Sequence, residues 1–334
     1  MEKRVSVGMS GGVDSAVAAL LLKKEGFDVR GYTLVFGPWG RAVDDVKSVA
    51  AHLDIPLSVI PADILFRKEI ITPFIEEYRL GRTPSPCPLC NPLKFALGLE
   101  AAGGEGYVAS GHYARIEKGA LFAAPHDKDQ SYFLARLSES LLGRMILPLG
   151  EMTKEEVREE AVRAGLSVAE KAESQDVCFI PDGDYRAFLK REGLFPCQGE
   201  ALSEEGEKIG EHDGYFHYTR GQRFRLGGTP GRLYVTGSDP AGNTLTIGPD
   251  DSLWSRELKG TGFHALASPE ELAGPLMAKI RSRDSLHPCR LERREEEFGL
   301  LFEEEVRAVT PGQLAVLYKD SEAGLRVVGS GWIL

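Results

Sequence analysis

Cysteine is scarce in this sequence, and long apolar segments are missing. Five cysteines in 334 residues are too few and too unevenly spaced for a disulfide scaffold, which favours the reducing cytoplasm. No stretch approaches the roughly 18 uninterrupted apolar residues of a membrane-spanning helix. The first apolar run ends at Ser10, which is too short for a secretory signal peptide. These absences predict a cytoplasmic protein without a membrane span.

Positive charge is in deficit. The chain has 40 Lys and Arg against 50 Asp and Glu, a net charge of −10. This balance argues against a protein that coats nucleic acid non-specifically, but it allows a local basic patch for one folded RNA. The hydrophobic share of 42% and the charged share of 27% exclude a disordered, collagen-like or fibrous chain. The length of 334 residues predicts two or three domains of roughly 100–200 residues each.

Short strands and helices alternate over the first third of the chain. Apolar runs predict strands at residues 3–8, 28–34, 57–61 and 107–110. Helical spacing predicts helices at residues 13–25, 43–53 and 153–164, the last opened by a capping box of Thr153 and Glu156. Strands that alternate with such helices predict an α/β fold, a doubly wound parallel sheet with helices on both faces.

The character of the sequence changes after about residue 182, where turn residues become dense and helical periodicity fades. Residues 233–235 and 245–247 flank a turn and predict a hairpin. Further short strands are expected at residues 278–280, 306–309, 315–318 and 326–328. We therefore predict three domains: a catalytic domain over residues 1–181, a small β-rich central domain over 182–258 and a C-terminal β-barrel over 259–334.

A glycine-rich loop joins the first predicted strand to the first predicted helix. Its two adjacent glycines let backbone N–H groups approach an anion, and the helix N-terminus adds positive potential. The serine hydroxyls can donate to phosphate oxygens, and the aspartate can hold Mg²⁺. The loop matches neither G-x-x-x-x-G-K-[ST] nor G-x-G-x-x-G. The candidate ATP-binding residues are Gly8, Met9, Ser10, Gly11, Gly12, Val13, Asp14 and Ser15.

The string S-G-G-V-D-S at residues 10–15 resembles the PP-loop of ATP pyrophosphatases. That superfamily cleaves ATP between the α and β phosphates and adenylates its substrate. It includes amidotransferases, synthetases and tRNA-thiolating enzymes, so the loop alone does not choose the substrate.

Further motifs narrow the resemblance, and they lie at residues 81–91, 110–115, 127–134, 147–180, 221–223 and 307–313. In this order they resemble the tRNA-specific 2-thiouridylase family over residues 5–332, nearly the whole chain. The resemblance implies ATP-dependent activation of the C2 oxygen of a wobble uridine in tRNA, followed by replacement of that oxygen with sulfur. It also implies a sulfur donor as partner: a cysteine desulfurase, a sulfur-relay protein or sulfide.

Two cysteines lie within these motifs. Cys90 precedes Asn91 and Pro92, a plausible N-cap and first helical position, where a thiol is expected to have a lowered pKa. By resemblance, Cys178 carries a persulfide, and Cys90 attacks it and forms a transient disulfide. With Asp14, they are the candidate catalytic residues.

Cys87 departs from the family, which usually has an acidic residue there. Three interpretations stay open. In one, Cys87, Cys90 and Cys178 ligate a [4Fe–4S] cluster whose fourth iron binds sulfide. In another, the persulfide chemistry runs on two cysteines. In the third, Cys87 and Cys90 form a redox pair. The remaining Cys197 and Cys289 match no motif.

Other site residues are carried over from the resemblance. Gly111 would border ATP, Leu34 would lie near the adenine, and His112 would touch the target nucleotide. Asp129 has an alternative role at the Mg²⁺–ATP site. The candidate tRNA contacts are His112, Lys128, Asp129, Gln130, Arg281, Ser282 and Gln313.

Two other functions compete with tRNA thiolation. A PP-loop sulfurtransferase or ligase could act on a substrate other than tRNA, and it would need no platform of C-terminal arginines. A non-catalytic RNA-binding or Fe–S protein could retain the fold, but the intact Ser10, Asp14, Ser15, Cys90 and Cys178 argue against it.

Overall fold

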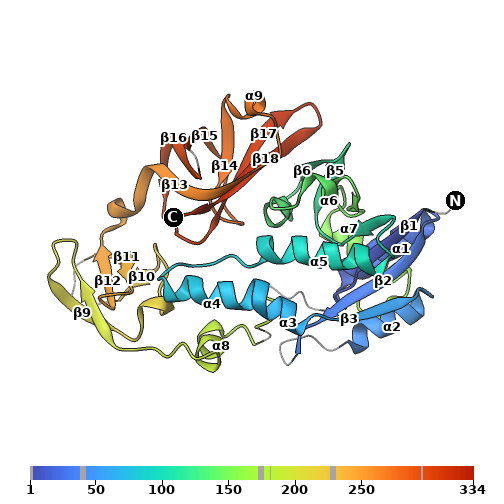
Figure 1. The fold of residues 1–334 in the computed structure, drawn as a ribbon, viewed down its shortest axis with the longest axis horizontal. Coiled ribbons are helices and arrows are strands. Elements are labelled where there is room, and N and C mark those ends of the chain that lie inside the picture. The colour runs from blue at the N-terminus through green and yellow to red at the C-terminus, as the bar shows by residue number, and fades with distance from the viewer. Residues whose placement is uncertain (1–2, 38–42, 172–176, 181, 226–230, 295) are drawn as a thin grey trace. The chain divides into compact units, whose positions relative to one another are not determined.

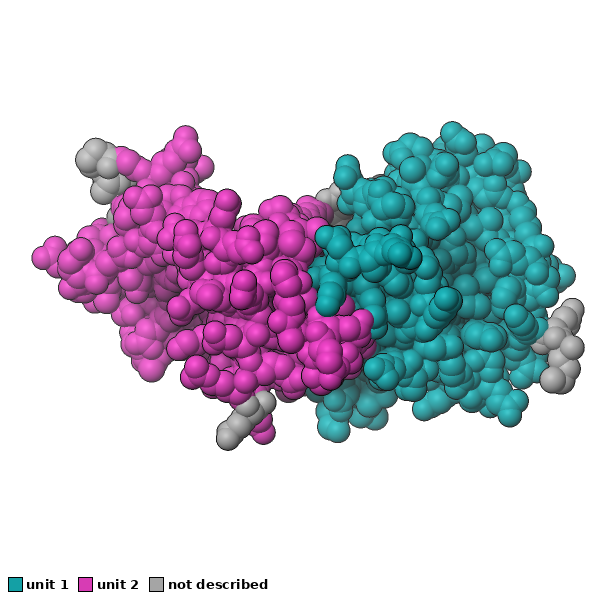
Figure 2. Space-filling view, turned by 90° about the horizontal axis from the view of Figure 1, so that it is seen from above, with its two compact units in different colours: residues 1–70, 87–183, 318–327 teal, residues 71–86, 184–317, 328–334 magenta. Residues whose placement is uncertain are grey.

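The computed structural model describes residues 3–37, 43–171, 177–180, 182–225, 231–294 and 296–334. The chain divides into two compact units, coloured separately in Figure 2. The first unit comprises residues 1–70, 87–183 and 318–327, and the second comprises 71–86, 184–317 and 328–334. No helix among the described residues is long and apolar enough to cross a membrane.

A five-stranded parallel sheet forms the centre of the first unit. The strands run in the order β3-β2-β1-β4-β7, and every pairing is parallel. Their bounds are β1 Arg4–Gly8, β2 Asp28–Val35, β3 Leu57–Pro61, β4 Tyr107–Ala109 and β7 Met145–Ile146. The predicted parallel α/β fold is confirmed. The strand order reverses between β1 and β4, and open sheets of this kind bind ligands at the carboxyl ends of the strands at that point.

Helices cover the sheet on both faces, as right-handed crossovers require (Figure 1). Helix α1 spans Val13–Lys24 and packs against α7, Lys154–Arg163, through an apolar cluster that includes Val17 and Ala161. Helix α2 spans Asp44–His52. The predicted capping box at the start of α7 is present.

Helix α5 spans Cys87–Ala101 and packs on β1, β2 and β4. The expected start at Asn91 and Pro92 is wrong, because the helix begins four residues before Asn91. Pro88 fits the second helical position, where a backbone N–H has no partner within the helix anyway. Pro92 then lies inside the helix, and it costs the hydrogen bond that residue 92 would otherwise donate.

The first unit also contains a hairpin that the pattern did not predict. Strands β5, Ala114–Glu117, and β6, Ala120–Ala123, are antiparallel. The two turn residues Lys118 and Gly119 both have positive φ, at 50° and 79°. This is the geometry of a two-residue hairpin turn, which needs no asparagine when a lysine accepts the left-handed conformation. The short elements α3 Asp63–Phe66, α6 Glu139–Leu142 and η3 Ser131–Leu134 also belong to this unit.

The second unit contains a small sheet with the order β10-β11-β12-β8-β9. Its strands are β8 Gly199–Leu202, β9 Lys208–His212, β10 Arg223–Phe224, β11 Leu233–Asp239 and β12 Thr244–Gly248. The predicted hairpin is the pair β11 and β12. Helices α4, Thr72–Arg79, and α8, Tyr185–Arg191, also belong to this unit, and their Tyr78 and Tyr185 rings stack at 5.5 Å.

The C-terminal strands form a closed antiparallel barrel in the order β13-β16-β15-β14-β17-β18, with β18 pairing back onto β13. Their bounds are β13 Trp254–Ala265, β14 Leu276–Lys279, β15 His287–Arg294, β16 Glu297–Arg307, β17 Leu314–Ser321 and β18 Gly324–Ile333. The expected barrel is confirmed.

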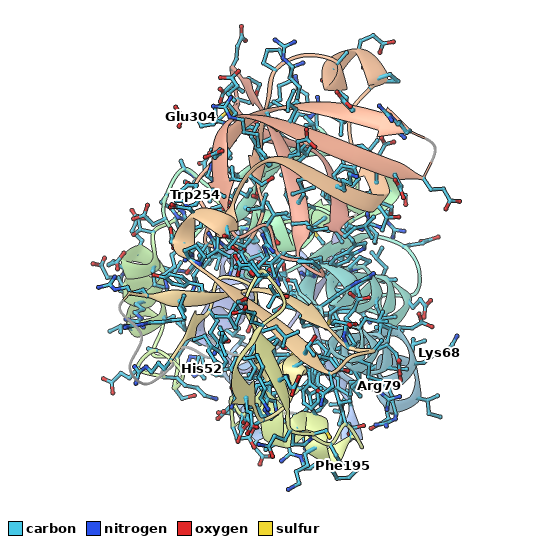
Figure 3. The ribbon with its side chains drawn as sticks, turned by 90° about the vertical axis from the view of Figure 1, so that its left-hand side faces the viewer. His52, Lys68, Arg79, Phe195, Trp254 and Glu304 are labelled. Atoms are coloured by element: carbon cyan, nitrogen blue, oxygen red, sulfur yellow. The ribbon has the colours of Figure 1, made fainter. Side chains whose placement is uncertain are left out.

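The strand expected at residues 306–309 ends earlier, at Arg307, because Ala308 takes a left-handed φ of 57°. Glu304, labelled in Figure 3, lies with Glu303 and Glu305 on exposed positions of β16. This charge run is therefore a solvated strand surface.

Candidate active site in the first unit

The phosphate loop lies where β1 ends and α1 begins, at the reversal of strand order. Gly11 has a φ of 71°, which favours glycine, and Gly12 caps the helix in an extended conformation. The hydroxyl of Ser15 accepts from the Ser10 backbone N–H at 3.1 Å and donates to the Gly12 carbonyl at 3.1 Å. The Ser10 and Ser15 hydroxyls are 3.2 Å apart. The loop is therefore held in a closed turn by its own side chains.

Asp14 is held by two residues from distant parts of the chain. Its Oδ1 accepts from Lys154 Nζ at 2.6 Å and from the Tyr113 hydroxyl at 2.7 Å. The Lys154 side chain is only 5% exposed, whereas that of Asp14 is 33% exposed. Sequence reasoning missed Lys154. The available signal was a lysine in the first turn of a helix, where the macrodipole disfavours a cation without a specific partner.

Gly111 follows β4 and lies against the first turn of α1. A Cβ atom there would come within 2.5 Å of the Asp14 carbonyl carbon and 2.7 Å of its oxygen. Only glycine allows this approach. Gly111 therefore adjoins the phosphate loop, while Leu34 lies half-buried at the carboxyl end of β2, beside Ile60 of β3.

Cys87, Cys90 and Cys178 are half-buried and lie near one another in the first unit. Burial raises the pKa of Cys87 to about 11, and the Cys178 thiolate raises it as well. Burial also raises the pKa of Cys90 to about 12, which Lys94 opposes. The expected lowering of the Cys90 pKa is wrong. The thiol lies in the first turn of α5, but removal of water outweighs the field of the helix terminus.

Lys94 is a second residue that sequence reasoning missed. It lies one turn after Cys90 on α5, with Nζ 4.8 Å from the centroid of the Phe95 ring. Its charge lowers the pKa of both Cys87 and Cys90. A lysine four residues after a cysteine on a helix was the available signal.

His112 lies beyond Gly111, beside the same helix. Its Nδ1 is 2.8 Å from the Ser110 hydroxyl, and its ring meets the edge of Phe95 at 6.0 Å between centroids. Burial, with a contribution from Lys94, lowers the pKa of His112 well below its ordinary value. The imidazole is therefore neutral at pH 7 and can donate or accept one hydrogen bond toward a nucleobase.

Metal-ligating geometry is not found around these thiols. Within the part of the chain that the structure describes, no three His, Cys, Asp or Glu side chains form a group that could hold a metal ion. All three cysteines belong to that part of the chain. Asp14 is a single carboxylate, and Mg²⁺ at ATP sites commonly takes one or two carboxylates plus phosphate oxygens.

Several predicted contact residues have partners inside their own unit. The Asp129 carboxylate accepts from Ala124 N, Ser131 N and the Ser131 hydroxyl, at 3.0–3.1 Å. Gln130 Oε1 accepts from Tyr113 N at 3.0 Å. In the second unit, Gln313 Nε2 donates to the Thr83 carbonyl at 2.7 Å, and Arg281 Nε lies 3.6 Å from Asp284.

The other predicted contact residues lie at the surface or in a turn. Lys128 is exposed beside Asp129, and Ser282 is half-buried in the turn after β14. The motif residues Glu173, Ser174, Gln175 and Asp176 lie outside the described residues.

The sheet order, the phosphate loop at its reversal point and the neighbouring thiols define an α/β protein of the nucleotide-binding class. Three family models match the chain: the tRNA methyl transferase HUP domain at residues 3–182, the tRNA methyl transferase PRC-barrel domain at 186–249 and the aminomethyltransferase beta-barrel domain at 255–333.

Curated relatives match over nearly the full length. A tRNA-specific 2-thiouridylase MnmA from Geotalea uraniireducens is 42% identical over 99% of this chain and 95% of its own. A second, from Trichlorobacter lovleyi, is 42% identical over 99% of this chain and 97% of the relative. A third, from Fervidobacterium nodosum, is 38% identical over 96% of this chain and 98% of the relative. The chain belongs to the tRNA-specific 2-thiouridylase family.

Proposed function

We propose that this protein is an ATP-dependent tRNA-uridine 2-sulfurtransferase that acts on the wobble position. The observation that carries the proposal is the shared location of the closed phosphate loop, His112 and three thiols at the carboxyl end of one parallel sheet. Membership in the 2-thiouridylase family supports the substrate.

The first step activates the uridine. The C2 oxygen attacks the α phosphorus of ATP, the bond to pyrophosphate breaks, and the base is adenylated. Backbone N–H groups of residues 8–15 and the N-terminus of α1 would hold the phosphates, with Leu34 and Gly111 bordering the nucleotide. Asp14 is the carboxylate available to Mg²⁺. Lys154 adds a buried positive charge at Asp14, where it can offset charge that builds on the phosphates.

The second step replaces oxygen with sulfur. The terminal sulfur of a Cys178 persulfide attacks C2, and AMP leaves. Cys90 thiolate then attacks the Cys178 sulfur, the sulfur–sulfur bond breaks, and the 2-thio group is released with a Cys90–Cys178 disulfide behind it. The two thiols supply the two electrons that reduce the transferred sulfur. Lys94 assists by favouring the Cys90 thiolate against burial.

A neutral His112 would contact the target base, and polar groups of each unit would contact the tRNA. The proposed contacts are Lys128, Asp129, Gln130, Arg281, Ser282 and Gln313. A cysteine desulfurase or a sulfur-relay protein would load Cys178, and the cytoplasm is the proposed location.

The test uses protein purified without oxygen. Iron and acid-labile sulfide are measured, and tRNA 2-thiolation is assayed with ATP and either a persulfide donor or sulfide. Iron-free protein that thiolates tRNA only with the persulfide donor supports the proposal. Activity that depends on about four irons per chain would refute the persulfide route, and failure to thiolate any tRNA would refute the function. Cys90→Ala and Cys178→Ala should each abolish thiolation and leave ATP binding near normal.

A further inference from the structure

Cys87 lies on the same face of α5 as Cys90, one turn earlier. The two residues are three positions apart in a regular helix, at its first and fourth residues. Cα atoms at this spacing in an α-helix lie about 5 Å apart, within the roughly 4.4–6.8 Å that a disulfide needs. Two cysteines with this separation at the start of a helix are the arrangement of dithiol oxidoreductases.

Cys178 is close enough to both helix cysteines for its charge to act on each of them. Lys94 acts on both helix thiols in the opposite sense and favours their thiolates. All three thiols are half-buried, whereas Cys197 is exposed and Cys289 is buried in the barrel core. The site therefore contains one thiol more than the sulfur transfer uses.

We propose that Cys87 is a third catalytic cysteine, which reopens the Cys90–Cys178 disulfide after each sulfur transfer. This inference rests on the proposed function. The Cys87 thiolate attacks the Cys90 sulfur, the Cys90–Cys178 bond breaks, and Cys178 leaves as a thiolate that takes up a proton. A Cys87–Cys90 disulfide remains. An external dithiol reductant then supplies two electrons and two protons to restore both helix thiols.

This exchange assigns persulfide loading and disulfide reduction to different pairs of residues, whereas a two-cysteine enzyme must use one pair for both. Cys178 becomes free to accept the next persulfide as soon as the exchange is complete. Reduction then takes place at the start of a helix, on neighbouring residues, rather than on a bond that joins two distant segments. The exchange itself is intramolecular, so its rate does not depend on the concentration of reductant.

The experiment compares wild type with Cys87→Ser and Cys87→Ala, and Cys197→Ser is the control variant. Each protein is loaded with persulfide, freed of reductant and given ATP and tRNA for one turnover. Thiols are then blocked with acid and N-ethylmaleimide, and disulfides are mapped by peptide mass spectrometry. A second assay measures continuous turnover with a persulfide donor and a protein dithiol reductant, and then with increasing dithiothreitol.

We expect a Cys87–Cys90 disulfide in wild type and Cys197→Ser, and a Cys90–Cys178 disulfide in both Cys87 variants. The first turnover should match wild type within about twofold, and continuous turnover should fall about tenfold or more until dithiothreitol restores it. A Cys90–Cys178 disulfide in wild type with Cys87 alkylated, or unchanged continuous turnover in both variants, would overturn the inference. Absence of the first turnover in wild type would instead overturn the proposed function.

Discussion

The contact between Lys154 and Asp14 gives the sharpest test of the phosphate-loop geometry. Lys154→Met removes the ammonium group and keeps most of the aliphatic stem. It leaves Asp14 with Tyr113 as its remaining partner at Oδ1. Breaking a fully buried ion pair costs about 3–5 kcal/mol. The Asp14 side chain is 33% exposed, so solvent takes up part of that loss, and about 2 kcal/mol is the expected decrease in unfolding free energy.

The decrease is measurable as a shift in thermal midpoint. For a domain of this size, each kcal/mol lowers the midpoint by about 2–4 °C, so Lys154→Met should lower it by about 4–8 °C. A double-mutant cycle with Asp14→Asn should give a coupling free energy of about 1–2 kcal/mol. Pyrophosphate release should fall about 100-fold, because a charge placed beside the phosphates is lost.

Lys208→Met is the matched control, since Lys208 also contacts two carboxylates, at 3.0 and 3.2 Å, but on an exposed surface. Its thermal midpoint should equal that of wild type. The prediction is refuted if the double-mutant cycle between Asp14 and Lys154 gives no coupling free energy, or if Lys154→Met and Lys208→Met have the same thermal midpoint.

Three further predictions concern the same site. Tyr32→Phe removes a buried hydroxyl that has no hydrogen-bond partner among the described residues, so the free energy of urea unfolding should be unchanged or raised by about 1 kcal/mol; a loss of about 1 kcal/mol would contradict this. Gly111→Ala should weaken ATP binding about tenfold or more by calorimetry, because its Cβ would collide with Asp14; unchanged affinity would contradict the packing. The rate of Cys90 alkylation should rise about tenfold per pH unit from pH 7 to 10 without a plateau, because the Cys90 pKa of about 12 lies above that range. Lys94→Met should lower this rate, and a plateau near pH 8 would refute the burial argument.

The sequence predicted those features that depend on short stretches of chain. Apolar runs such as Leu57–Pro61 formed strands with the expected bounds, and the capping box placed the start of α7. The sequence predicted a C-terminal barrel but not the end of β16. That strand ends at Arg307 because Ala308 takes a left-handed backbone conformation, which hydrophobic periodicity does not reveal.

The features that sequence reasoning missed depend on the tertiary structure. Lys154 and Asp14 are 140 positions apart, so their pairing exists only after the chain has folded. The acidity of Cys90 was predicted from its place at a helix start, but burial decides it, and burial comes from neighbours supplied by other elements. Proline is common at the first helical position, which predicts that place for Pro92, yet the helix begins at Cys87 and contains Pro92 in its interior.

The segment before α5 has a consequence for how this protein can vary. The Thr83 N–H donates to the Pro311 carbonyl at 2.9 Å, and the Thr83 carbonyl accepts from Gln313 Nε2, so both backbone groups of Thr83 are hydrogen-bonded. Only residues 84–86 separate it from Cys87, and two of them are prolines with little freedom in φ. A surface loop such as residues 203–207 can absorb an insertion at small entropic cost. An insertion beside Thr83 would displace one of these two hydrogen bonds, so this segment should tolerate a change of length less readily than residues 203–207. Natural variants should therefore keep the length of this segment constant.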